Sequence, residues 1–193
     1  MSATHRIALF GGTFDPIHLG HLTIANEAAR LFALDQVVFI PAANPPHKSI
    51  ATPYEDRLKM VELACARDPR FVASRLEADS ARKSYSIDTI ERWMAAASTN
   101  LSPTFIIGAD AFSEITTWHR WQDVVGAVEF IVVARRGHVI SPPPNARVHR
   151  LETLALPVSS SEIRKRLREG GVPAELQPNV LDHIRRNHLY QNQ

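Results

Sequence analysis

Residues 11–21 read Gly11-Gly12-Thr13-Phe14-Asp15-Pro16-Ile17-His18-Leu19-Gly20-His21 and join two regular segments of the chain. An apolar run precedes them at residues 7–10, and a helical pattern with apolar residues on one face follows. The paired glycines are expected to end a strand and to let a ligand approach the backbone closely. A helix start leaves backbone N–H groups unpaired and carries a partial positive charge. The sequence therefore predicts a phosphate site between a strand and a helix.

The two histidines of this stretch lie three residues apart, so on a helix they share one face. Gly20 between them leaves that face without a side chain, and a base or ribose can lie there while His18 and His21 point at the same phosphates. Two other interpretations of the pair stay open: half of a zinc site, for which no second ligand pair is evident, and ordinary helix-cap residues. The stretch matches neither the P-loop nor the G-x-G-x-x-G pattern.

The complete string resembles the H-x-G-H signature of the nucleotidyltransferase superfamily. Its long form, G-G-T-F-D-P-I-H-x-G-H, is similar to that of the bacterial nicotinate mononucleotide adenylyltransferases. The resemblance covers residues 7 to about 168. It implies that His18 and His21 are catalytic and stabilise the reacting phosphate and the leaving pyrophosphate. It also implies that the rest of the stretch binds ATP through Gly11, Gly12, Thr13, Phe14 and Gly20.

Strand and helix patterns alternate along the chain. Strands are expected at residues 7–10, 37–40, 71–73, 105–107, 130–133 and 154–158. Helices are expected from residue 52, over 87–97, from 159 to Gly170 and after Pro178, with Thr52 and Glu55 forming a capping box. This order predicts an α/β fold, a Rossmann-like doubly wound parallel sheet with helices on both faces. The length suits one nucleotidyltransferase domain over residues 1–193.

Five polar or glycine-rich stretches follow predicted strands. In parallel sheets, ligands bind beyond the carboxyl ends of the strands. We therefore expect these stretches to open on one edge of the sheet: residues 11–12, 44–48, 108–110, 135–137 and 159–161.

A serine-rich stretch, residues 159–166, combines three hydroxyls, a helix start and several cations. Such an end can bind the β- and γ-phosphates of a triphosphate, although a serine cap on a solvated basic helix explains it as well. The stretch resembles the family motif I-S-S-S-x-I-R-x-R, with Val158 in place of Ile. By that resemblance Ser159, Ser160 and Arg164 bind ATP.

The proline loop Asn44-Pro45-Pro46-His47-Lys48 ends in two polar side chains. On its own it is an ordinary surface loop with an exposed lysine. The family has the same loop, which implies that Lys48 binds phosphate and that Asn44 lies with the acceptor substrate. Arg136, which follows the strand at 130–133, is expected to help hold the triphosphate.

Three further motifs resemble those of the family and imply a pyridine nucleotide as acceptor. Gly108-Ala109-Asp110 is similar to I-I-G-x-D, which places Gly108 beside the adenosine and Asp110 on a ribose or on the pyridine nucleotide. Trp118 matches a family tryptophan that stacks on the pyridine ring, whereas Trp121 is assigned to the core. Residues 84–90 are similar to S-Y-T-x-x-T-[LI], so Tyr85 and Thr89 are expected near the pyridine carboxylate.

The composition excludes several classes of protein. The 193 residues are 45% hydrophobic, and 22 basic residues nearly balance 20 acidic ones. No global field therefore favours nucleic acid or a membrane as partner. No apolar run approaches membrane-spanning length, and we see no signal-peptide pattern. The single cysteine, Cys65, cannot form an internal disulfide, and a cytoplasmic location is expected.

The resemblance implies an adenylyltransferase that joins ATP and nicotinate mononucleotide into nicotinate adenine dinucleotide and pyrophosphate. Mg²⁺ is expected on the phosphates, and no metal site built from protein ligands is predicted. Three alternatives stay open: another acceptor such as phosphopantetheine, a fragment of a class I aminoacyl-tRNA synthetase, and a catalytically silent nucleotide sensor. A homo-oligomer also stays open.

Overall fold

The computed structural model describes residues 5–46, 50–78, 83–97, 103–152 and 158–191. Within them, six parallel strands form one sheet in the order β3-β2-β1-β4-β5-β6. The strands are β1 (Ile7–Gly12), β2 (Gln36–Pro41), β3 (Phe71–Ala73), β4 (Thr104–Gly108), β5 (Glu129–Ala134) and β6 (Arg147–Glu152). The direction of winding reverses between β1 and β4, as in doubly wound folds. The expected α/β architecture is confirmed.

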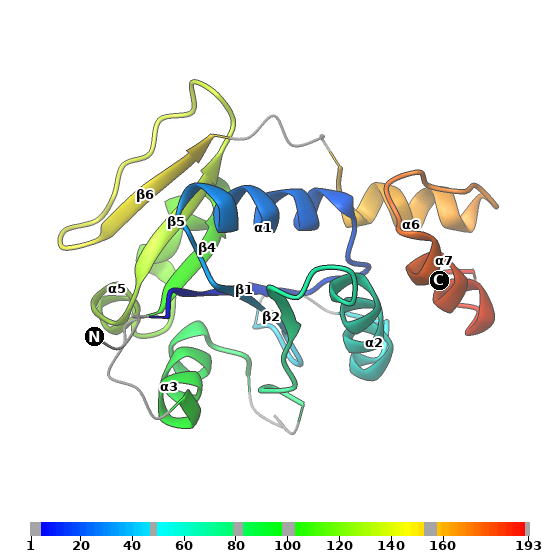
Figure 1. The fold of residues 1–193 in the computed structure, drawn as a ribbon, viewed down its shortest axis with the longest axis horizontal. Coiled ribbons are helices and arrows are strands. Elements are labelled where there is room, and N and C mark those ends of the chain that lie inside the picture. The colour runs from blue at the N-terminus through cyan, green and yellow to red at the C-terminus, as the bar shows by residue number, and fades with distance from the viewer. Residues whose placement is uncertain (1–4, 47–49, 79–82, 98–102, 153–157, 192–193) are drawn as a thin grey trace.

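Helices cover both faces of this sheet (Figure 1). The helical elements are α1 (Leu19–Leu31), α2 (Tyr54–Cys65), α3 (Ser86–Ala97), α4 (Ala109–Ser113), the 3₁₀ turn η1 (Ile115–Thr117), α5 (Trp121–Ala127), α6 (Ser160–Arg168) and α7 (Pro178–Arg186). None of the helices in the described residues is long and apolar enough to cross a membrane.

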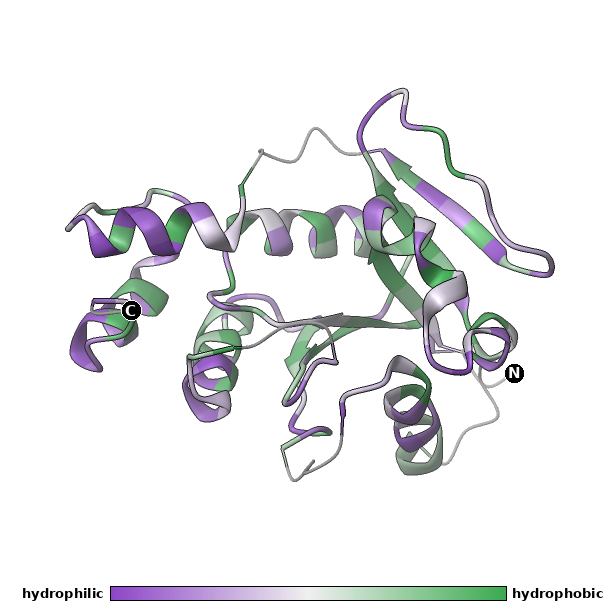
Figure 2. Ribbon diagram, turned by 180° about the vertical axis from the view of Figure 1, so that it is seen from behind, coloured by the Kyte–Doolittle hydropathy of each residue, from purple (hydrophilic) through white to green (hydrophobic). Residues whose placement is uncertain are grey.

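Two hydrophobic cores lie on opposite faces of the sheet, because successive strand residues point to opposite sides. Ala8 and Phe10 of β1 face the core formed with α1, α2 and α7, whereas Leu9 faces the core formed with α3, α4 and α5. Figure 2 shows the resulting pattern, with apolar strands inside and polar helix faces outside. Burial on both faces explains why the central strands read as continuous apolar runs rather than as alternating ones.

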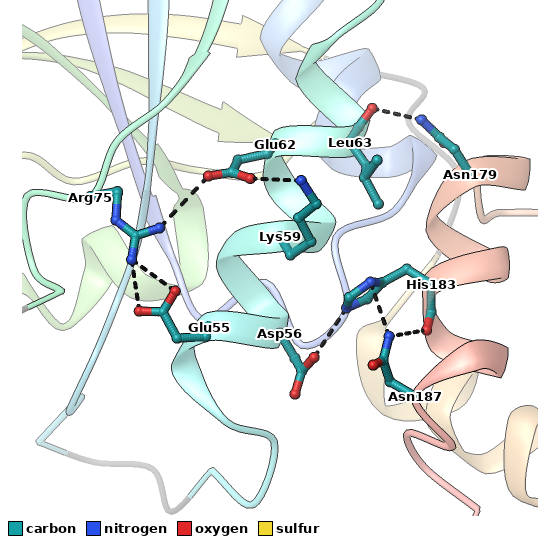
Figure 3. A network of polar contacts seen from close by, with 9 residues as sticks. All are labelled: Glu55, Asp56, Lys59, Glu62, Leu63, Arg75, Asn179, His183 and Asn187. Atoms are coloured by element: carbon teal, nitrogen blue, oxygen red, sulfur yellow. Dashed lines mark hydrogen bonds and ion pairs between the residues drawn. The ribbon is translucent and has the colours of Figure 1, made fainter.

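The helix α7 is fastened to α2 by polar contacts (Figure 3). Asn179 donates its side-chain N–H to the carbonyl of Leu63 at 2.8 Å. The Nε2 atom of His183 lies 3.1 Å from a carboxylate oxygen of Asp56. These contacts hold the C-terminal segment against α2.

Two sequence expectations about elements are corrected. The predicted cap of α2 is wrong: Pro53 is the N-cap residue, no side chain caps the helix, and Glu55 instead accepts both of its 2.8 Å hydrogen bonds from Arg75. The last strand, β6, was not expected at Arg147–Glu152, because an edge strand with one buried residue, Leu151, lacks the apolar run of a central strand. Most of the strand expected at 154–158 lies outside the described residues, and Val158 is not in a strand.

Candidate active site

The site lies where the winding of the sheet reverses. Gly11 and Gly12 end β1, Gly108 ends β4, and the start of α1 stands beside them. A Cβ atom placed on Gly108 would meet no atom within 4 Å, so open space adjoins this backbone. Crevices of this kind, at the carboxyl ends of adjacent strands, are where doubly wound sheets bind their ligands.

The two histidines are stacked on each other at the start of α1. His18 is the N-cap residue, and its backbone N–H donates to Nδ1 of His21 at 3.3 Å. The ring centroids are 3.8 Å apart and the planes are inclined by 26°. The shared face predicted from their spacing is therefore confirmed, and the two rings act as one unit at the end of the helix.

Both imidazoles are neutral at physiological pH in this structure. Burial lowers the pKa of His18 to about 4, against a smaller opposing effect of the Glu175 carboxylate. Burial also lowers the pKa of His21 well below its ordinary value, and the neighbouring His18 lowers it further. A neutral imidazole still has one N–H to donate, so the pair can serve as hydrogen-bond donors without carrying charge.

Gly20 makes room for His18 rather than for a ligand. A Cβ atom at residue 20 would lie 3.0 Å from Nδ1 and 3.1 Å from Cε1 of the His18 ring. The expectation that a base or ribose lies in this space is thus corrected, because the imidazole itself occupies it. Gly20 is also buried, which leaves its place among the ATP contacts without support from the geometry.

Phe14 is a second residue whose expected ATP contact the structure restricts. Its side chain is buried in the core, with its ring centroid 5.1 Å from that of His21. A Cβ atom on Gly12 would lie 2.9 Å from this ring, so glycine is required there. Phe14 also adopts a left-handed φ of 47°, a conformation that L residues rarely take. Only its backbone can face a nucleotide, while the ring supports His21 from behind.

Arg57 on α2 is a buried residue that the sequence interpretation missed. Its Nη1 donates to the carbonyls of Thr13 at 2.7 Å and Ala42 at 2.8 Å, and its Nε donates to that of Thr52 at 3.2 Å. The guanidinium therefore joins the chain after β1 to the chain after β2. Burial lowers its pKa, against the opposing effect of Asp15 and other groups. No periodicity distinguishes this arginine, because it stands directly beside the apolar stripe of its helix.

The serine-rich helix α6 reaches the same loop from the far end of the sequence. Ser159 accepts the N–H of Glu162 at 3.1 Å, which confirms the predicted cap. The hydroxyl of Ser160 donates to the carbonyl of Pro16 at 3.0 Å. Arg164 donates to the carbonyl of Asp15 at 2.6 Å and lies 3.7 Å from its carboxylate. The convergence of the first and last predicted motifs is therefore present, although these side chains bind the loop itself.

The buried carboxylate of Glu77 joins the segments that carry Asn44 and Thr89, two residues expected to bind the acceptor. Thr89 donates its hydroxyl to Glu77 at 2.6 Å, and the other oxygen of Glu77 accepts the N–H of Ala43 at 3.1 Å. Asn44 exchanges two 2.9 Å bonds with Ser84, one through each backbone group. The Thr89 hydroxyl is thus committed to Glu77, a residue in a loop without any motif that sequence reasoning could use.

Aromatic residues border this region. The rings of Tyr85 and His119 have centroids 4.4 Å apart, which joins the start of α3 to the segment before α5. Trp118 and Trp121 are both half-buried and both pack against the second core, so burial does not separate their expected roles. Asp110 is exposed in the first turn of α4.

The sequence also predicts two cationic phosphate ligands, Arg136 and Lys48. Arg136 is exposed in the segment after β5. Lys48 lies outside the described residues. Within the described residues, no group of three or more histidine, cysteine, aspartate or glutamate side chains could hold a metal ion.

Comparison with known proteins agrees with this geometry. Residues 9–166 match the family model described as cytidylyltransferase-like. A probable nicotinate-nucleotide adenylyltransferase of Solibacter usitatus is 56% identical over 187 residues, covering 96% of this chain and 99% of the relative. The chain belongs to the nicotinate-nucleotide adenylyltransferase family. A second family member, from Thermus thermophilus, is 40% identical over 190 residues, covering 96% of this chain and 99% of its own.

Solved structures show the same fold as this adenylyltransferase family member. The nicotinic acid mononucleotide adenylyltransferase of Plasmodium falciparum, complexed with NaAD, has a TM-score of 0.82 at 20% identity and covers 98% of this chain and 99% of its own. A putative nicotinate-nucleotide adenylyltransferase of Vibrio parahaemolyticus has a TM-score of 0.70 at 22% identity, with 98% of each chain covered.

The buried histidines predict a loss of stability in acid. Since the pKa of His18 falls from 6.5 to about 4 on folding, the unfolded chain binds more protons between these values. The stabilisation is complete above pH 6.5 and is lost as the pH falls toward 4. This residue alone should lower the free energy of unfolding by about 2 kcal/mol between pH 7 and pH 5. Urea unfolding at both pH values measures it.

The variant His18→Gln should show a smaller difference between the two pH values, because its side chain does not titrate. His138→Gln, which changes an exposed histidine in the segment after β5, is the control. Equal pH dependence in His18→Gln and the wild type would contradict the assignment of the effect to His18.

The contact between Gly20 and His18 predicts that Gly20→Ala displaces the imidazole. Alanine favours a helix by about 1 kcal/mol over glycine, so the fold should persist while turnover drops by roughly 10–100-fold through misplacement of the ring. Gly126→Ala in α5, where a Cβ atom meets nothing within 4 Å, is the matched control. Unchanged turnover in Gly20→Ala, measured as pyrophosphate release, would mean that the ring position does not matter.

Proposed function

We propose that this protein transfers the adenylyl group of ATP to nicotinate mononucleotide, forming nicotinate adenine dinucleotide and pyrophosphate for NAD biosynthesis. One observation carries the proposal: the stacked pair His18 and His21 stands at the helix start beside the reversal of the sheet. The 56% identity to a probable nicotinate-nucleotide adenylyltransferase supports the choice of acceptor. The Plasmodium falciparum enzyme, which has the same fold, forms complexes with NaAD and with APC.

In this reaction an oxygen of the 5′-phosphate of nicotinate mononucleotide attacks the α-phosphorus of ATP. A new P–O bond forms as the bond to the bridging oxygen of the β-phosphate breaks, and pyrophosphate leaves with that electron pair. No protein nucleophile is needed, so catalysis consists of positioning and of stabilising negative charge.

The histidines have the central role in the proposal. His18 and His21 donate N–H groups to the phosphate oxygens, and the positive end of α1 adds to their effect. Burial is the main cause of the lowered pKa of each ring. A bound polyphosphate favours the protonated form of each ring and so raises its pKa. The rings then carry positive charge while negative charge develops on the phosphates.

The remaining predicted residues divide between the two substrates. The backbone of residues 11–13, with Ser159, Ser160 and Arg164, lies on the triphosphate side, where Lys48 and Arg136 add positive charge. Open space beside Gly108 suits the adenosine. Asn44, Tyr85, Thr89, Asp110 and Trp118 border the pyridine nucleotide.

Mg²⁺ is proposed to enter with ATP. Mg²⁺ prefers oxygen ligands and retains several waters, and it is commonly bound through substrate phosphates with one or two carboxylates. The Asp15 carboxylate is already engaged by Tyr190 and Arg164, so the substrate phosphates and waters are proposed to supply most of the ligands of Mg²⁺. A cytoplasmic location and a homo-oligomeric state stay predictions.

The test combines purified protein with Mg·ATP and one acceptor at a time: nicotinate mononucleotide, nicotinamide mononucleotide or phosphopantetheine. Pyrophosphate and the dinucleotide should form fastest with nicotinate mononucleotide. Pyrophosphate release with phosphopantetheine alone would show that the proposed acceptor is wrong. No pyrophosphate release with any of the three acceptors would support a silent nucleotide sensor.

Replacing either histidine should abolish most of the activity. His18→Ala and His21→Ala are each expected to lower kcat by roughly 10²–10⁴ because a donor to the developing charge is lost. Circular dichroism and the unfolding midpoint verify that the variants are folded. If either variant turns over at the wild-type rate, that histidine has no part in the reaction.

A further inference from the structure

The segment after α6 has no motif in the sequence, yet one of its side chains, Tyr190, contacts the loop that leads to His18. Tyr190 is 2% exposed, and its hydroxyl donates to the Oδ1 atom of Asp15 at 2.7 Å across 175 residues of sequence. Asp15 is itself buried, at 8% exposure. Burial and this carboxylate raise the pKa of Tyr190, so that the hydroxyl keeps its proton and can donate at any physiological pH.

Asp15 belongs to the loop that leads from β1 to His18. Residues 13–18 lie between a strand and a helix, and side chains from distant segments hold their carbonyls: Arg57 at Thr13, Arg164 at Asp15 and Ser160 at Pro16. Tyr190 completes this set by holding the one carboxylate of the loop. Without the Tyr190 hydroxyl, a buried carboxylate oxygen loses a hydrogen-bond donor.

The backbone near Tyr190 is shaped to bring the ring inward. His188 and Tyr190 both adopt left-handed conformations, with φ of 51° and 65°. Such conformations are costly for residues with a side chain and persist where the surroundings hold them in place. Upstream in the same segment, the carbonyl of Glu175 accepts the first N–H of α1, from Leu19, at 2.8 Å. The C-terminal segment thus contacts the chain on both sides of His18, at Asp15 and at Leu19.

We infer that Tyr190 is a positioning residue of the adenylyl-transfer site, which fixes the loop of residues 13–18 through Asp15 and thereby sets where His18 meets the phosphates. The inference deepens the proposed function and rests on it for its kinetic test. It predicts that loss of one hydroxyl impairs turnover more than it impairs folding, because small displacements of a catalytic group cost much of the rate.

A purely structural role is the alternative, and the α2–α7 contacts provide its control. Asn179 and His183 anchor the same C-terminal segment to α2 through Leu63 and Asp56 (Figure 3). Asn179→Ala should therefore destabilise the segment while the hydroxyl of Tyr190 and its hydrogen bond to Asp15 stay in place. Tyr190→Phe keeps the ring and removes only the hydroxyl, so the two variants separate anchoring of the segment from positioning of the loop.

The kinetic test measures kcat, both KM values and the unfolding midpoint for wild type, Tyr190→Phe and Asn179→Ala. Tyr190→Phe should lower kcat by 10–100-fold with each KM changed less than threefold, whereas Asn179→Ala should lower the midpoint and leave kcat unchanged. Equal kcat losses in the two variants, or a changed midpoint with unchanged kcat in Tyr190→Phe, would overturn the inference.

The double variant Asp15→Asn/Tyr190→Phe tests the mechanism and also covers the case in which Tyr190→Phe folds poorly. It removes the buried carboxylate that the missing hydroxyl leaves with one hydrogen-bond donor fewer, so it should fold and recover part of the lost turnover, a coupling that independent sites do not show. Additive losses in the double variant would overturn the inference.

A readout independent of the reaction keeps the two proposals separate. NMR titration of the His18 ring reports its burial whether or not the protein transfers adenylyl groups. In Tyr190→Phe the pKa of His18 should rise from about 4 toward 6.5 as the loosened ring gains water, and in Asn179→Ala it should not move. An unmoved His18 pKa in Tyr190→Phe would refute positioning even if the proposed acceptor were wrong.

Discussion

The guanidinium of Arg57 joins the two chain segments that leave β1 and β2, and the geometry of the site depends on that joint. Its hydrogen bonds to the carbonyls of Thr13 and Ala42 satisfy backbone that neither a strand nor a helix can pair. A buried cation with carbonyl partners is costly to desolvate and costly to remove. Arg57 therefore fixes the start of the loop of residues 13–18 more firmly than a flexible surface lysine could.

Elsewhere in the site, two glycines leave space that the side chains of other residues fill. Gly12 admits the ring of Phe14, and Gly20 admits the ring of His18. Phe14 then supports His21, which is stacked on His18. The rings of the two histidines are thus buried by packing, which accounts for their neutrality, while hydrogen bonds to the loop of residues 13–18 fix the chain that carries them.

The sequence allowed the parallel sheet, the helices around it and the position of the histidine pair to be predicted, because buried strands and helix starts leave local patterns. It did not reveal Arg57, Glu77 or Tyr190. These residues form hydrogen bonds with segments 12 to 175 residues away, and no local periodicity records such a contact. The strand β6 was missed for a related reason, since Leu151 is its one buried residue.

The contact between Tyr190 and Asp15 also bears on the order in which the molecule folds. Contacts between residues so far apart in sequence form late, because the intervening chain must be ordered first. The sheet can therefore be complete before the loop around His18 is. In the native state the same contact couples the loop to local unfolding of the C-terminal segment. Such unfolding should expose the loop while the central strands stay protected from hydrogen exchange.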